Sequence, residues 1–208
     1  KKLYTESKKL FADASMNLRE FNSNSERFLE SVESADLVKD EESKILGVPW
    51  NRKTDEFVMA VPEVKEGPVT KRSILSNLFR VYDPLGFVAP VTVRGRILLQ
   101  KVTKLKLDWN AKVPEDVQTE WKSILADIQR LSEIKIQRFY GIDQTKKQRL
   151  MVFSDASRKA YSAVIYLQGK GFKDEFKSHL IFAKARVNPV KELTIPRLEL
   201  MGVLIATR

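Results

Sequence analysis

Two carboxylates, Asp155 and Glu199, lie at positions from which the predicted secondary structure could bring them into one site. Asp155 directly follows the run Leu150-Met151-Val152-Phe153-Ser154, which is typical of a buried strand. Glu199 lies in the stretch Leu193–Leu200, where Pro196 is typical of the first turn of a helix. Carboxylate oxygens bind hard cations such as Mg²⁺ or Mn²⁺, and two such cations about 4 Å apart can clamp both reacting oxygens of a phosphodiester. Asp155 and Glu199 are therefore the candidate catalytic and metal-binding residues.

The elements that would position these acids follow from hydrophobic patterning. Three runs rich in β-branched and aromatic residues predict strands over 149–154, 161–168 and 179–185, ahead of the helix that carries Glu199. Upstream, apolar residues at helical spacing predict helices over 70–81, from Pro90 and from Pro114. Nearer the N-terminus we expect a helix over 3–14, then a hairpin made of 44–50 and 56–60. This order predicts an α+β chain.

The positive charge is concentrated in the helical region. Residues 70–107 contain eight basic residues against one acid, Asp83, and thus a net +7 of the chain's +10. The basic residues are Lys71, Arg72, Arg80, Arg94, Arg96, Lys101, Lys104 and Lys106. Arg94, Lys101 and Lys104 would share one stripe of their helix. Such a segment is typical of a surface that contacts a nucleic-acid backbone, although a solvated helical face has the same composition.

Composition excludes several kinds of site. The 208 residues include no cysteine, so disulfides and thiolate zinc sites are excluded, which fits an intracellular and cytoplasmic protein. The single histidine, His179, excludes histidine-rich metal sites, and its neighbours indicate an ordinary strand position. No apolar run approaches the roughly 20 residues of a membrane helix.

Five stretches share their residues with one known family: Lys44–Asn51, Thr70–Ser76, Tyr82–Pro90, Val152–Ser157 and Leu193–Leu200. Through them the chain resembles the polyprotein of Pao-type (BEL/Pao) long-terminal-repeat retrotransposons. The resemblance implies a multi-domain α+β protein. Residues 1–66 would be the C-terminal edge of a reverse-transcriptase palm with a primer-grip-like hairpin, 67–140 a helical thumb and connection, and 147–208 the N-terminal half of a ribonuclease H-like α/β domain.

The same resemblance implies an activity for the parent protein. The full polyprotein would be an RNA-directed DNA polymerase with ribonuclease H, and the polymerase aspartates would precede Lys1. The partners would be RNA–DNA hybrid or duplex and the remaining polyprotein domains, with no membrane. Lys71, Arg72, Arg94, Lys101 and Lys104 would contact the duplex backbone, and Trp50 would lie near the primer.

Asp155 and Glu199 would be the first and second of the four acidic residues in a ribonuclease H site. The third and fourth belong to a later strand and helix, which we expect beyond Arg208. The fragment is therefore expected to bind Mg²⁺ or Mn²⁺ weakly or not at all and to show little or no turnover.

Two other functions remain open from the sequence. This region also carries a Pao retrotransposon peptidase label, but an aspartic peptidase requires Asp-Thr-Gly or Asp-Ser-Gly, and the nearest approach, Asp155-Ala156-Ser157, lacks the glycine. A non-enzymatic relic or a host-adopted interaction module is the second alternative. Salt-dependent binding of a hybrid would separate a nucleic-acid-binding protein from such a relic.

Overall fold

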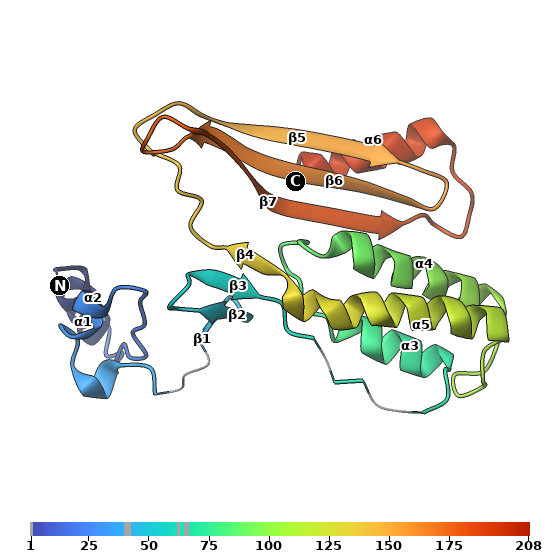
Figure 1. Cartoon of the computed structure of the whole chain (residues 1–208), viewed down its shortest axis with the longest axis horizontal. Coiled ribbons are helices and arrows are strands. Elements are labelled where there is room, and N and C mark those ends of the chain that lie inside the picture. The colour runs from blue at the N-terminus through green and yellow to red at the C-terminus, as the bar shows by residue number, and fades with distance from the viewer. Residues whose placement is uncertain (1, 40–42, 62, 65–66) are drawn as a thin grey trace. The chain divides into compact units, whose positions relative to one another are not determined.

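The computed structural model describes residues 2–39, 43–61, 63–64 and 67–208. These residues form six α-helices and two antiparallel sheets (Figure 1). The chain divides into two compact units, the first made of Lys1–Val58 with Lys135–Phe139 and the second of Met59–Ile134 with Tyr140–Arg208. The predicted mixture of helices and strands is confirmed, while the assignment of regions to palm, thumb and connection stays a prediction.

The first unit is built from short elements and a small sheet. They are α1 (Lys2–Asp13), α2 (Glu26–Leu29), the 3-10 helix η1 (Ser34–Asp36), β1 (Ser43–Ile45), β2 (Val48–Asn51), β3 (Glu56–Val58) and β4 (Lys135–Gln137). The strands pair in the order β1-β2-β3-β4. Val48, Trp50 and Phe57 form the apolar cluster of this sheet, because they alternate onto one face of β2 and β3.

One predicted strand of this unit is wrong in its extent. Residues 44–50 form two strands, because Leu46 and Gly47 adopt φ values of 51° and 82° and reverse the chain between β1 and β2. Two successive left-handed residues are typical of a type I′ hairpin turn, for which glycine is well suited. The predicted hairpin with the following strand is present as the β2–β3 pair.

Three helices form one layer of the second unit. They are α3 (Lys71–Phe79), α4 (Ala89–Lys104) and α5 (Glu115–Gln129). Thr70 caps α3, because its hydroxyl accepts from the Ser73 amide at 3.1 Å while the Ser73 hydroxyl accepts from the Thr70 amide at 2.9 Å. The proline-based starts are also confirmed, with Pro90 in the first turn of α4 and Pro114 as the N-cap of α5.

The helical layer contains the best-buried side chains of the unit. Ile74, Leu98 and Val102 are fully buried, and Ile124 and Ile128 of α5 have at most 1% of their surface exposed. Phe79 and Leu105 share the helical spacing of the buried apolar residues but are 63% and 44% exposed. Both lie at helix C-termini, where the chain leaves the packed layer.

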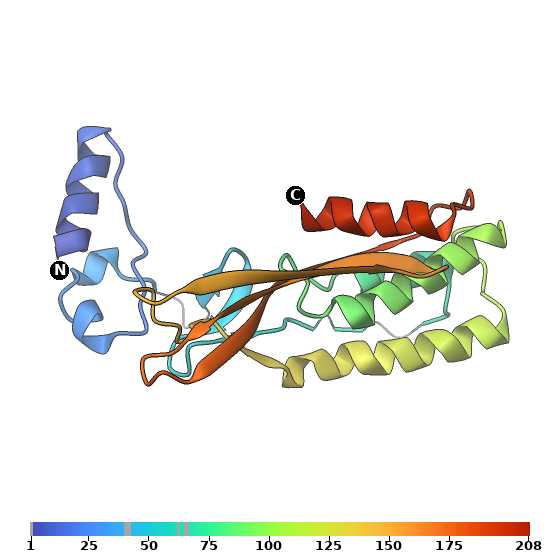
Figure 2. The ribbon, with the colours of Figure 1, turned by 90° about the horizontal axis from the view of Figure 1, so that it is seen from above.

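A three-stranded sheet and one helix complete the second unit. The strands β5 (Gln148–Ala156), β6 (Ala160–Lys170) and β7 (Phe176–Val187) pair antiparallel in chain order. Helix α6 (Ile195–Ala206) then lies along one face of this sheet (Figure 2), where it contacts β5 and β6. The predicted order of three strands followed by a helix is confirmed.

The two edges of this sheet differ. At the β7 edge the Ala183 amide donates to Leu85 O at 2.8 Å, Arg96 donates to Ala185 O at 3.2 Å and Gln100 donates to Asn188 O at 2.6 Å. The helical layer therefore satisfies backbone groups of β7 and packs against the sheet there. Within the described residues, β5 has no strand partner on its other edge. In the part of the chain that the structure describes, no helix is both long and apolar enough to span a lipid bilayer.

Candidate functional site

Asp155 lies at the end of β5, as predicted. It is the penultimate residue of the strand and is paired in register with Ser162 of β6. Its side chain is exposed, so solvent or a ligand can reach it. The strand ends one residue later because the chain turns through Ser157, whose hydroxyl accepts from the amides of Lys159 and Ala160, both at 3.2 Å.

Helix α6 brings Glu199 to the same end of the sheet. Thr194 precedes the helix in an extended conformation (φ −70°, ψ 151°), and Pro196 stands in the first turn. On the buried face, Leu198 is 2% exposed, and a Cβ placed on Gly202 would lie 3.3 Å from the backbone oxygen of Ser162 and 3.5 Å from both the backbone oxygen of Asp155 and the Ser154 Cβ. The missing side chain thus allows α6 to pack closely on β5 and β6 at the level of Asp155. Glu199 is exposed one helical turn before Gly202.

These two carboxylates do not form a complete metal centre. Mg²⁺ commonly keeps several waters and takes only one or two protein carboxylates, so exposed carboxylates are the type of ligand it would use. Among the described residues there is no group of three or more His, Cys, Asp or Glu side chains that could hold a metal ion. A two-metal site would need further acids.

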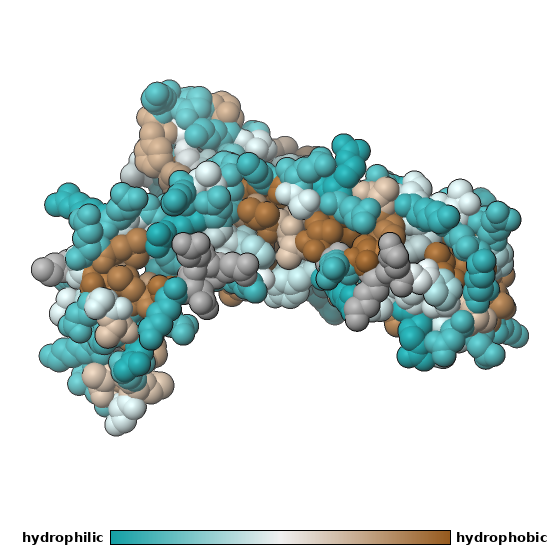
Figure 3. Space-filling model, turned by 60° about the horizontal axis from the view of Figure 1, so that its bottom comes forward, coloured by the Kyte–Doolittle hydropathy of each residue, from teal (hydrophilic) through white to brown (hydrophobic). Residues whose placement is uncertain are grey.

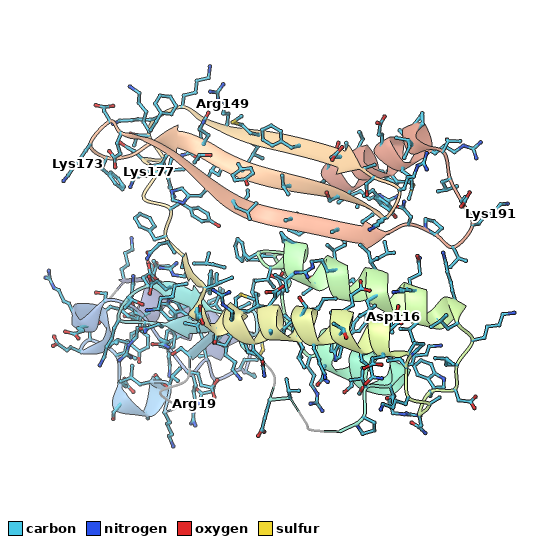
Figure 4. The ribbon with its side chains drawn as sticks, turned by 45° about the vertical axis from the view of Figure 1, so that its right-hand side comes forward. Arg19, Asp116, Arg149, Lys173, Lys177 and Lys191 are labelled. Carbon is cyan, nitrogen blue, oxygen red and sulfur yellow. The ribbon has the colours of Figure 1, made fainter. Side chains whose placement is uncertain are left out.

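Two members of the predicted basic stripe on α4 are paired with α5. Arg94 forms an ion pair with Asp127, and Lys101 forms ion pairs with Asp116 at 3.0 Å and Glu120 at 3.2 Å (Asp116 is labelled in Figure 4). The hydrogen bond from Lys101 lowers the pKa of Asp116, and the two acids raise the pKa of Lys101. Two of the three cations in this stripe are therefore paired with acids inside the helical layer. Lys104, in the last turn of α4, is exposed.

Lys71 and Arg72 lie at the start of α3 beside Trp109. The Lys71 ammonium is 4.4 Å from the centroid of the Trp109 ring, which suits a cation–π contact. Arg72 donates from Nε to Asn110 at 2.8 Å, and its amide donates to Trp109 O at 3.1 Å. Trp109 is 47% exposed. The sequence singled out the two cations but did not predict their contact with this tryptophan, because the residues lie far apart in the chain.

Trp50 is buried in the first unit. Its ring is 9% exposed, its Nε1 donates to Asp55 at 2.9 Å, and the Arg138 guanidinium lies 5.5 Å from the ring centroid. Burial alone would raise the pKa of Asp55, but hydrogen bonds from Arg138 and Trp50 lower it overall. Trp50 thus packs as a core residue, and its contact with a primer stays a prediction.

Comparison with known families agrees with this arrangement of strands and helices. Residues 70–208 match the family described as the Pao retrotransposon-like RNaseH-like domain. The chain belongs to this Pao family. The match confirms the resemblance drawn from the sequence, and it begins at the N-cap of α3, so the Pao domain includes the helical layer as well as the sheet. A search of curated proteins gave no match.

Proposed function

We propose that this chain is the ribonuclease H region of a Pao-type retrotransposon polyprotein, that Asp155 and Glu199 are two ligands of a divalent cation, and that the adjacent surface binds an RNA–DNA hybrid. The close packing of α6 on β5 at Asp155 is the observation that supports the proposal most directly. Through this packing, Asp155 and Glu199, the two acids predicted to act together, lie on neighbouring segments of a Pao domain.

Basic residues surround this end of the sheet. Arg158 and Lys159 occupy the β5–β6 turn and Arg197 the first turn of α6, and all three are exposed. Lys191, in the loop before α6, lies at the same end of the sheet (Figure 4). No ion pair joins these four cations to an acid within the described residues. A phosphodiester beside the carboxylates would therefore meet cations on both sides.

The turn that carries two of these cations is held from the helical layer. Asn188 donates from Nδ2 to Ser157 O at 2.9 Å, and its own carbonyl accepts from Gln100 of α4 at 2.6 Å. Hydrogen bonds therefore link Gln100 of α4, through Asn188, to Ser157, which lies two positions after Asp155. It supports a role for the helical layer in positioning the site.

The metal part of the proposal can be tested by thermal unfolding with and without MnCl₂. Wild type should melt a few degrees higher with Mn²⁺, because a ligand that binds only the folded state stabilises it. Asp155→Asn and Glu199→Gln should abolish that shift, and Asp155→Asn should slightly stabilise the metal-free protein by relieving repulsion between the carboxylates. Glu115→Gln, an exposed acid on α5, is the matched control and should keep the shift. A shift that persists in both site variants would remove the proposed metal site.

The nucleic-acid part is tested by anisotropy with a labelled RNA–DNA hybrid over a salt series. The affinity for the hybrid should fall steeply with salt. For each phosphate contact, a tenfold rise in salt concentration should lower the logarithm of the binding constant by about 0.9. Hybrid cleavage by the 208-residue chain should stay undetectable, because the described residues offer no third acid. Salt-independent or absent binding would favour the non-enzymatic alternative, and pepstatin-sensitive peptide cleavage that is lost in Asp155→Asn would favour the peptidase.

A further inference from the structure

A groove of about 710 Å³ lies between α3 and α5 in the second unit, and three cations line it. Arg72 and Arg80 from α3 and Lys122 from α5 are its charged lining residues. No acidic residue lines it within the described part of the chain. Its volume falls in the range of about 300–1,000 Å³ typical of ligand pockets.

The charge of the groove follows from the way α5 separates its side chains. The acids Asp116, Glu120 and Asp127 are paired with α4 on one side of the helix. Lys122 comes two residues after Glu120 and five before Asp127, so at 100° per residue it points to another side. These three acids are thus paired with cations of α4, whereas Lys122, on the side of α5 that faces the groove, forms no ion pair within the described residues.

The groove combines this cationic rim with an apolar floor. Trp121 is 2% exposed and lies at the bottom with the half-buried Leu125, while Asn77 adds a buried amide. Apolar side chains also reach the surface in strips framed by hydrophilic residues on the face shown in Figure 3. Arg72 is held in place by Asn110, which orients its remaining guanidinium donors without neutralising them.

We propose that this groove binds unpaired nucleotides of a nucleic-acid strand, with bases against the apolar floor and phosphates on Arg72, Arg80 and Lys122. A ligand that is flat and apolar at one end and anionic at the other matches the two halves of the groove. A duplex presents its phosphates but keeps its bases stacked inside, so it would not use the floor. The inference goes beyond hybrid binding at Asp155 and does not depend on it.

The test measures anisotropy of labelled single-stranded dT₁₂ and U₁₂ over a salt series. Arg72→Gln, Arg80→Gln and Lys122→Gln together should weaken binding at least about tenfold and reduce the salt slope by about 2 units, at roughly 0.7 per phosphate contact. The matched control combines Arg94→Gln, Lys101→Gln and Lys104→Gln, which removes the same charge from α4, and should change single-strand affinity by less than about threefold. Arg80→Gln alone should weaken binding in the same direction if the triple variant is poorly folded.

Other outcomes would overturn the groove proposal. Equal losses in the two triple variants would show a response to net charge only, and absence of single-strand binding by wild type would show that the groove has another ligand. If inorganic phosphate competed with the labelled strand as well as dTMP does, the groove would be a site for anions only and the proposal would be wrong. The Mn²⁺ shift and hybrid binding are measured on the same variants, so failure of the groove is distinguishable from failure of the site at Asp155.

Discussion

In the second unit, the helical layer and the sheet differ in how deeply their side chains are buried and in whether they carry the candidate carboxylates. The helices bury Leu98 and Val102 completely, whereas the β5 residues Leu150, Val152 and Phe153 are between 46% and 60% exposed. The candidate carboxylates belong to the exposed side of this division, on the sheet and α6. The difference indicates that the helical layer contributes strongly to stability through burial, while the sheet leaves an accessible surface beside the proposed cation site.

A matched pair of leucines should give the largest measurable contrast. Leu98→Ala, at a fully buried position, should lower the free energy of unfolding by about 3 kcal/mol, through lost burial and the cavity left behind. Leu150→Ala, at a position that is 60% exposed, should cost less than about 1 kcal/mol. Urea unfolding measures both. Similar losses would mean that the exposed β5 surface is packed against something that stabilises the fold as much as the helical core does.

The contact between the two layers can be broken at one glycine. Gly86 has φ +77°, and a Cβ there would lie 1.7 Å from the Ala183 carbonyl oxygen of β7. Gly86→Ala should cost roughly 2 kcal/mol or more, and should remove hydrogen-exchange protection from the Ala183 amide that donates to Leu85.

Gly141→Ala is the control for that prediction. Gly141 also has a positive φ, of 62°, but a Cβ there would meet only the end of the flexible Lys177 side chain. We expect Gly141→Ala to lower the free energy of unfolding by about 1 kcal/mol, through backbone strain alone. Equal effects of the two substitutions would mean that the close approach of the 85–86 turn to β7 does not stabilise the protein.

The smallest effect should come from the ion pairs between α4 and α5. Lys101 lowers the pKa of Asp116, so this interaction stabilises the fold above the ordinary carboxylate range and is lost as the pH falls through the lowered pKa. Lys101→Gln should therefore slightly destabilise the protein at pH 7 and have less effect near pH 2. Urea unfolding at both pH values measures the difference. A loss of the same size at both would show that the ammonium acts through packing, not through charge.

Local patterns were predictable where one segment carries the whole signal. The starts of α3, α4 and α5 follow from Thr70, Pro90 and Pro114, because a capping side chain or a fixed φ acts within a few residues. The order of β5, β6, β7 and α6 likewise follows from the composition of each run. The Leu46–Gly47 turn was missed, because leucine in a left-handed conformation gives no sequence signal.

The roles of the charges depended on distant residues. The sequence shows that Arg94 and Lys101 share a helical face, but only the packing of α5 against α4 pairs them with its acids. The same packing leaves Arg72, Arg80 and Lys122 on a groove lined by no acid within the described residues. Electrostatic compensation acts over a few ångströms in space, and residues tens of positions apart can meet only in the fold.

The sequence by itself determined the family of the chain, the types and order of its main elements, and the two carboxylates that could act together. The tertiary structure decided how closely α6 approaches the backbone at Asp155, which edge of the sheet is covered, and which cations are paired with acids. The physical reason is one of range. Helix and strand propensities are local, whereas close packing at Gly86 and Gly202 and the pairing of charges are properties of surfaces that meet only when the chain has folded.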